Sequence, residues 1–175
     1  MLDKIRIATE EDFEAAWKLY VEVCEQMPND AYSPGWTLGV FPAKAGVREA
    51  IEARELYVGM LDSAVVAAFV LSPHDDEEYR DVPWPSGATG DDVSTVHLLA
   101  VHPYVRGKHV SSELIREAVR LSRSWGKRAV HLDVMPGNLA ASRVYLREGF
   151  SFVCEHEIFY EDTGTIAFEM YEHAL

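Results

Sequence analysis

Apolar side chains recur along this chain with two spacings, and each spacing predicts a type of element. After a short strand at Ile5 to Ala8, apolar residues from Phe13 to Cys24 return every three or four positions, which is the period of an amphipathic helix. Thr9, followed three residues later by Asp12, matches a capping box. The helix should therefore begin there and end before Met27-Pro28.

Two further apolar runs, Leu56 to Leu61 and Ala64 to Leu71, have the character of strands. Asp62 and Ser63 between them have the length of a tight hairpin connection, which predicts an antiparallel pair. The remaining elements are expected as helix 43–54, strand 94–101, helix 108–125, strand 129–134, helix 139–147 and strands near 150–160 and 165–171. Strand, helix, strand with short links implies a right-handed crossover and a parallel pair.

Two connections are long and unusual in composition. Residues 29–42 carry prolines and glycines among large aromatic side chains. Residues 74–92 are rich in acidic residues, prolines and glycines, and are longer than most connections in compact domains. The second segment is therefore either a functional lid or a mobile loop.

Length and composition narrow the class of protein. A chain of 175 residues, 48% of them hydrophobic, suits one domain spanning residues 1–175. The longest apolar run, Ala64 to Leu71, is far shorter than the roughly 20 residues that cross a bilayer, and no signal-peptide region is apparent, so we expect a cytoplasmic protein without a membrane partner. Cys24 and Cys154 suit reduced, partly buried thiols, and no metal-site spacing is apparent.

The charge balance argues against polyanionic partners. The chain has 29 acidic and 16 basic residues and a formal net charge of -13. The basic residues gather only between Arg116 and Arg128, where acidic neighbours favour the solvated face of a helix. We therefore expect neither nucleic acid nor an anionic membrane surface as a partner.

The most informative motif follows the predicted strand 94–101. An apolar strand leads into a tight loop that contains Arg106 and Gly107, and the loop opens a helix. Backbone N–H groups and the helix dipole converge at such a point, which makes it a phosphate-binding site. A strand followed by Arg-Gly and a helix also occurs as an ordinary structural turn.

A second motif favours the phosphate-binding interpretation. The loop resembles the acyl-coenzyme-A loop of GNAT acetyltransferases, with Arg106 at the first position, His109 where the family usually has Gly, and Ser111 where it has Gly or Ala. Asn138, Ala141, Val144-Tyr145 and Gly149-Phe150 follow the family's next motif in the same order. The resemblance implies an α/β (α+β) fold with a mixed, mostly antiparallel sheet of about six to seven strands, a central parallel pair and about four flanking helices.

The same resemblance implies the activity and the cofactor contacts. It implies acetyl transfer from acetyl-CoA to a primary amine of a small molecule, without a metal, and a possible homodimer. The cofactor would be contacted by Leu99, Ala100, Val101, Arg106, Gly107, Lys108, His109, Val110, Ser111, Ser112 and Asn138. A non-catalytic acyl-CoA-binding module is the alternative, suggested by His109, Ser111 and the threonine at position 95.

The reaction needs a base for the amine and a proton for the leaving thiolate. Many family members place a catalytic Glu where this chain has Thr95, whereas the run from His97 to His102 resembles the arylalkylamine N-acetyltransferase branch. His97 is the expected base and Tyr145 the expected acid; a hydrogen-bonded sheet histidine and a core aromatic are the alternatives. By alternation, Thr95, His97, Leu99 and Val101 should share one face of the strand. The reserve bases are His131 and Asp133, alternating outward together, and then Glu22 and Glu25.

Aromatic side chains in the two long connections are candidates for the acceptor site. These residues are Tyr32, Trp36, Phe41 and Trp84, with Tyr79 also to be considered. Together with the acidic residues 75–78 and 81 they would suit a cationic amine through cation–π contact and field attraction. The alternative is that the loops are only solvated and their aromatics cover the edge of the core.

Overall fold

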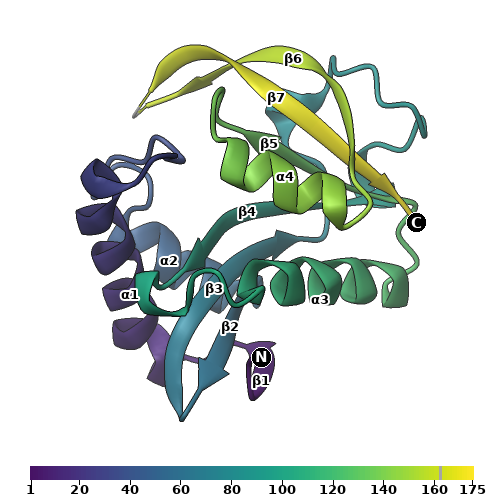
Figure 1. Ribbon diagram of the computed structural model, residues 1–175. Helices are drawn as coiled ribbons and strands as arrows, with labels where there is room; N and C mark the ends of the chain where they lie inside the picture. Colours follow the sequence, from purple (N-terminus) through teal and green to yellow (C-terminus); the bar gives the residue numbers. More distant parts are fainter. Residues whose placement is uncertain (162) are drawn as a thin grey trace.

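The computed structural model describes residues 1–161 and 163–175, and these form a seven-stranded sheet with helices on both faces (Figure 1). The elements are β1 (Lys4–Ile7), α1 (Phe13–Gln26), α2 (Lys44–Glu52), β2 (Leu56–Leu61), β3 (Ala64–Ser72), β4 (Val93–Val101), α3 (Val110–Ser124), β5 (Ala129–Val134), α4 (Leu139–Arg147), β6 (Ser151–Tyr160) and β7 (Gly164–Ala174). The amphipathic period thus predicted every helix to within a few residues.

The strand order is β1-β2-β3-β4-β5-β7-β6, and every neighbouring pair is antiparallel except the central β4–β5 pair. The predicted fold class, with a mostly antiparallel sheet and a parallel pair at its centre, is confirmed. Asp62 and Ser63 both have positive φ, 48° and 65°, as the two-residue hairpin turn requires.

The two faces of the sheet bury separate apolar clusters. One cluster packs α3 and α4 on the sheet through residues such as Leu114, Ile115 and Tyr145. The other packs α1 and α2 through residues such as Tyr20 and Ile51. The sheet is therefore the middle layer of three. In the part of the chain that the structure describes, no helix is both long and apolar enough to span a membrane.

The central parallel pair is short. Only Val93 to Thr95 pair with Ala129 to His131 in register, although both strands continue beyond this point. The ladder hydrogen bonds between β4 and β5 therefore stop at Thr95, and the two strands part toward their carboxyl ends. This gap is the feature of the fold that positions the site described below.

A β-bulge interrupts β4 just beyond this point. Ala100 pairs with Ala68 and His97 pairs with Val70, so Leu98 and Leu99 together oppose one residue of β3, and Leu98 has a φ of 49°. After the bulge the alternation is reversed, since Ala100 packs on the α1 side while Leu99 packs on the α3 side. The prediction that His97 shares a face with Leu99 and Val101 is therefore wrong, because alternation does not continue through an extra residue.

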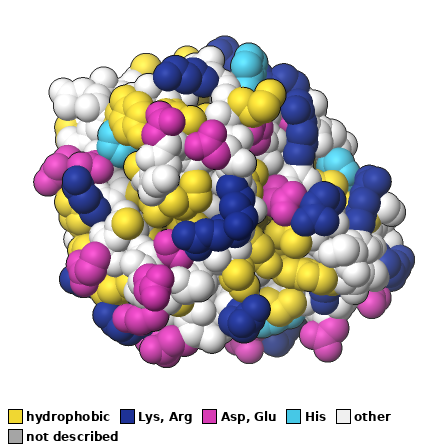
Figure 2. All heavy atoms as spheres, turned by 90° about the horizontal axis from the view of Figure 1, so that it is seen from below, with side chains coloured by type: hydrophobic (Ala, Val, Ile, Leu, Met, Phe, Trp, Pro, Cys, Tyr) yellow, Lys and Arg dark blue, Asp and Glu magenta, His cyan; other side chains and the backbone are white. Residues whose placement is uncertain are grey.

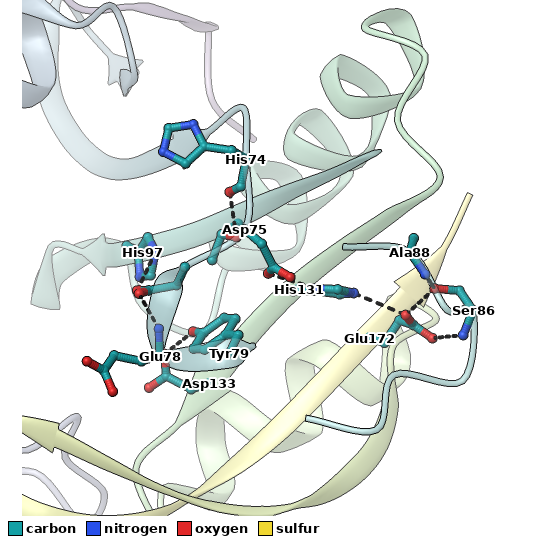
Figure 3. Close-up of polar contacts among 12 residues, drawn as sticks. His74, Asp75, Glu78, Tyr79, Ser86, Ala88, His97, His131, Asp133 and Glu172 are labelled. Carbon is teal, nitrogen blue, oxygen red and sulfur yellow. Dashed lines mark hydrogen bonds and ion pairs between the residues drawn. The ribbon is translucent and has the colours of Figure 1, made fainter. Parts of the chain in front are cut away.

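The acidic 74–92 segment is anchored along the sheet. Tyr79 and Ala88 are fully buried within it, Asp75 lies 2.9 Å from the imidazole of His131, and the Ser86 hydroxyl donates to Glu172 at 2.5 Å. Figure 3 shows this row of polar contacts running from His74 to Ser86 across the strands. The segment thus covers the face of β5 that carries His131.

Candidate active site

A cleft of about 400 Å³ opens where β4 and β5 part. Its floor is made by β4 from Val96 to Val101 and by the end of β5, and α4 contributes Ala141 and Tyr145. The other wall comes from the end of α1 and the aromatic loop that follows it. Because α4 and α1 lie on opposite faces of the sheet, the cleft connects the two faces through the gap in the sheet.

The predicted phosphate-binding loop lies beside this cleft. Gly107 has a φ of 76° and His109 a φ of 61°, and His109 is the N-cap of α3. Left-handed backbone is costly for a residue with a β-carbon, although histidine tolerates it better than most. His109 therefore occupies a strained backbone conformation that a glycine would adopt at little cost.

Backbone amides of this loop lie at the N-terminus of α3. Glu113 donates to the carbonyl of His109 at 3.2 Å, so the amides from Gly107 to Ser112 precede the ladder of the helix. Lys108 and His109 are exposed, Val110 is buried in the core, and Ser111 lines the cleft. The Ser112 hydroxyl accepts from the Arg147 guanidinium at 2.6 Å. Free amides at a helix N-terminus suit the diphosphate of a nucleotide cofactor.

Arg106 is engaged across the cleft. Its guanidinium donates to Asp30 at 2.6 Å and, more weakly, to the carbonyl of Val101 at 3.4 Å. Both Arg106 and Asp30 line the cleft, so this ion pair joins the loop before α3 to the segment that follows α1. Nothing in the sequence distinguishes Asp30 from the other acidic residues.

Tyr145 lies on α4 and lines the cleft. Its ring is only 8% exposed, and it packs on Phe150 at 5.7 Å between centroids. Burial, and then the negative charge of Asp133, raise the pKa of the phenol, so it carries its proton at neutral pH. Asn138 caps α4 by accepting the amide of Ala141 at 3.4 Å, and both residues line the cleft.

His97 and Asp133 enter the cleft from the facing edges of the two strands. His97 Nε2 lies 3.7 Å from Asp76 Oδ2, which the 74–92 segment supplies. Asp133 Oδ1 accepts the hydroxyl of Tyr79 in a short hydrogen bond and that of Tyr160 at 3.4 Å. Burial raises the pKa of Asp133, and the neighbouring His97 opposes that shift. Figure 3 shows the Tyr79 ring directed at Asp133.

The proposed acceptor aromatics divide into two groups. Tyr32, Trp36 and Phe41 line the cleft, and Phe41 stacks on Tyr160 with centroids 6.0 Å apart. Trp84 does not line it: the indole is 6% exposed and stacks on His131 at 3.6 Å. Trp84 is therefore a core residue, in keeping with the alternative that loop aromatics cover the core.

The reserve bases are also separated by the structure. His131 shares a face of β5 with Asp133 but is fully buried between Asp75 and Glu172, which lie 2.9 and 3.1 Å from its two ring nitrogens, so it does not reach the cleft. Glu22 pairs with His102 at 3.0 Å, and neither Glu22 nor Glu25 lines the cleft. Asp133 alone of the four reaches the cleft. Tyr160, which the sequence did not single out, ends β6 and also lines the cleft, with its hydroxyl 3.4 Å from Asp133 Oδ1.

The described part of the chain shows no cluster of metal-ligating side chains, and the face shown in Figure 2 does not carry one charge sign alone. No cluster of three or more metal-ligating side chains occurs among residues 1–161 and 163–175. Acidic and basic side chains are intermixed on the face shown in Figure 2, with hydrophobic side chains exposed between them.

Comparisons with known proteins identify this architecture. A sequence model described as the Acetyltransferase (GNAT) family matches residues 21–150. A GNAT-family acetyltransferase from Streptococcus agalactiae superposes with a TM-score of 0.81 at 14% identity, covering 100% of this chain and 98% of that one. No curated protein sequence matches the chain.

Two further structures of this fold were solved with a coenzyme. YncA from Salmonella typhimurium, with its cofactor acetyl-CoA, has a TM-score of 0.69 and 16% identity over 98% of this chain and 93% of that one. The PaiA N-acetyltransferase from Thermoplasma acidophilum, in complex with coenzyme A, has a TM-score of 0.66 and 16% identity over 98% of both chains. At this identity the likeness is one of fold.

Proposed function

Because the chain belongs to the GNAT acetyltransferase family, we propose that it is an N-acetyltransferase that moves an acetyl group from acetyl-CoA to a primary amine of a small molecule. The observation that carries the proposal is the cleft between β4 and β5, with a phosphate-type loop beside it and both His97 and Tyr145 in its lining. YncA and PaiA support the choice of coenzyme, since both were solved with one.

The residues at the start of α3 would hold the diphosphate of the cofactor. The amides from Gly107 to Ser112 offer donors, and the positive end of the helix dipole adds a favourable field. When bound there, acetyl-CoA supplies the thioester whose acetyl group is transferred. Leu99, Ala100 and Val101 line the cleft at the bulge, where main-chain groups of β4 no longer pair with β5 and could contact the pantetheine arm.

His97 would accept a proton from the acceptor amine, directly or through a water, so that the nitrogen lone pair can attack the thioester carbon. A new carbon–nitrogen bond forms and the carbon–sulfur bond breaks. Tyr145 would then donate its phenolic proton to the leaving thiolate, since its raised pKa keeps that proton in place until the sulfur becomes basic. His97 would then release its proton to solvent, and Tyr145 would regain one from solvent.

Thiol release from acetyl-CoA across an amine panel tests the activity, and Tyr145→Phe tests the acid. We expect kcat to fall by about 10²–10⁴ with the Kd for acetyl-CoA nearly unchanged, as is typical when a general acid is removed. Tyr171→Phe is the matched control, because that ring lies 6.3 Å from Tyr145, bonds Glu169 and does not line the cleft. Equal turnover of the two variants would remove Tyr145 from the mechanism.

A pH–rate profile tests the base. His97→Ala should lose the acidic limb of kcat/KM, whereas His156→Ala, a histidine bonded to the carbonyl of Glu78 outside the cleft lining, should keep it. An acidic limb that survives in His97→Ala contradicts the assignment. Cofactor binding with no turnover for any amine would favour the non-catalytic acyl-CoA-binding module.

A further inference from the structure

The charges in the cleft do not cancel. Among the described residues that line it, the permanently charged or acidic side chains are Asp30, Arg106 and Asp133, and His97 is the one imidazole. Asp30 and Arg106 neutralise each other at 2.6 Å. Asp133 has no Lys or Arg partner at its partly buried position, and His97 is the basic side chain whose charge favours its ionised form. A desolvated carboxylate of this kind is costly unless a cation joins it.

The hydrogen bonds of Asp133 leave one oxygen free for a ligand. Both Tyr79 and Tyr160 donate to Oδ1, and burial raises the pKa of each phenol, so both remain donors across the neutral range. Among the described residues no donor is recorded for Oδ2, and the side chain lines the cleft. The two phenols therefore hold the carboxylate through Oδ1 and leave its second oxygen available to a ligand in the cleft.

The place of Asp133 in the sheet puts it in the same part of the cleft as the expected base. Thr95 and His131 are the last paired residues of the parallel strands, and His97 and Asp133 each follow two positions later on the same face as their predecessor. The two side chains therefore lie on the same face of the sheet where the strands part, both line the cleft, and the charge of His97 influences Asp133. Tyr145, whose phenol is influenced by the charge of Asp133, approaches from the α4 side.

Aromatic rings line the same cleft as this carboxylate, and their apolar character indicates what the rest of the ligand should be. Tyr160 stacks on Phe41 with planes 7° apart and meets Phe168 edge-on with centroids 5.2 Å apart. All three rings line the cleft. A carboxylate in an aromatic setting suits an ammonium group attached to an apolar carbon body.

We propose that Asp133 receives the acceptor as an ammonium ion, beside His97, and that the acceptor is an apolar primary alkylamine without a carboxylate next to its nitrogen. This inference rests on the proposed function, because it names the acceptor of that reaction. Binding of the ammonium ion can nevertheless be measured without turnover. A neighbouring carboxylate, as in an amino acid, would lie against Asp133 and be repelled. The proton that Asp133 helps to bring in with the ammonium is the one that His97 removes.

Calorimetric titration of the protein saturated with coenzyme A tests this near neutral pH. The probes are cyclohexylmethylamine, which is protonated there, its neutral isostere cyclohexylmethanol, and the amino acid cyclohexylalanine. We expect the amine to bind at least tenfold more tightly than the alcohol, and the amino acid to bind more weakly than the amine. In Asp133→Asn, which keeps an oxygen for the two phenols, the amine and the alcohol should bind within about twofold of each other.

Two further variants separate this effect from misfolding and from overall charge. Asp133→Glu retains the negative charge and should keep a preference for the amine. Asp81→Asn removes the same charge from an exposed position of the 74–92 segment and should leave the preference as in the wild type. A preference that persists in Asp133→Asn, or that is absent from the wild type, overturns the proposal.

Failure of the ammonium site can be distinguished from failure of the proposed transferase reaction. If the amine preference depends on Asp133 but no thiol is released from acetyl-CoA, the ammonium site stands and the transferase reaction does not. If thiol is released while Asp133→Asn binds and turns over amines with unchanged selectivity, the reaction stands and the ammonium site does not.

Discussion

The left-handed backbone at His109 gives a prediction whose size follows from the structure. With a φ of 61°, this residue occupies a conformation that costs a side chain with a β-carbon about 1–2 kcal/mol and costs glycine almost nothing. Glycine loses about 0.5–1 kcal/mol through the greater freedom of its unfolded chain. We therefore expect His109→Gly to be more stable than His109→Ala by about 1 kcal/mol.

Urea unfolding of the two variants without cofactor measures this difference. His109→Ala is the matched comparison because it removes the imidazole but retains the β-carbon. Exposure of His109 means that losing the imidazole itself should change stability little. If the alanine variant equals or exceeds the glycine variant in free energy of unfolding, the backbone at this position is not held left-handed and the described cradle is wrong.

Two other predictions concern stability. The hydrogen bond from Arg6 is the main cause that holds the pKa of Asp12 at about 2, below its ordinary 3.8. Above roughly pH 4 the depressed pKa stabilises the fold by about 2 kcal/mol. This contribution should vanish as the pH falls toward 2 and the folded protein takes up the proton. Urea unfolding against pH should show that fall in the wild type and a flatter curve in Asp12→Asn. Gly149 has a φ of 91° after α4, and a β-carbon there would lie 3.0 Å from the His173 ring, so Gly149→Ala should lower the free energy of unfolding by about 1–2 kcal/mol. Thermal unfolding indistinguishable from the wild type would contradict the second prediction.

Local chemistry explains why much of the fold could be predicted. The three-to-four residue period of α1, the capping of that helix by Thr9 and Asp12, and the two-residue hairpin after Leu61 depend on neighbours in sequence. The observed order of strand, helix and strand also produced the central parallel pair that it predicted.

The site was harder to predict because it depends on contacts between distant segments. The bulge at Leu98 reverses the faces of β4, and no glycine or proline in the sequence marks it. Trp84 could not be placed because its partner, His131, is contributed by a strand far along the chain. Asp133 was recognised as a candidate, but its two phenol donors come from residues 54 and 27 positions away.

A crystal structure with acetyl-CoA bound would show whether the amides from Gly107 to Ser112 bind the diphosphate and whether the cleft directs the thioester toward Tyr145. We expect diphosphate density within hydrogen-bonding distance of those amides and the sulfur beside the Tyr145 hydroxyl, in the gap between β4 and β5. A cofactor bound elsewhere, or a loop closed over by the imidazole of His109 with the cleft empty, would contradict it.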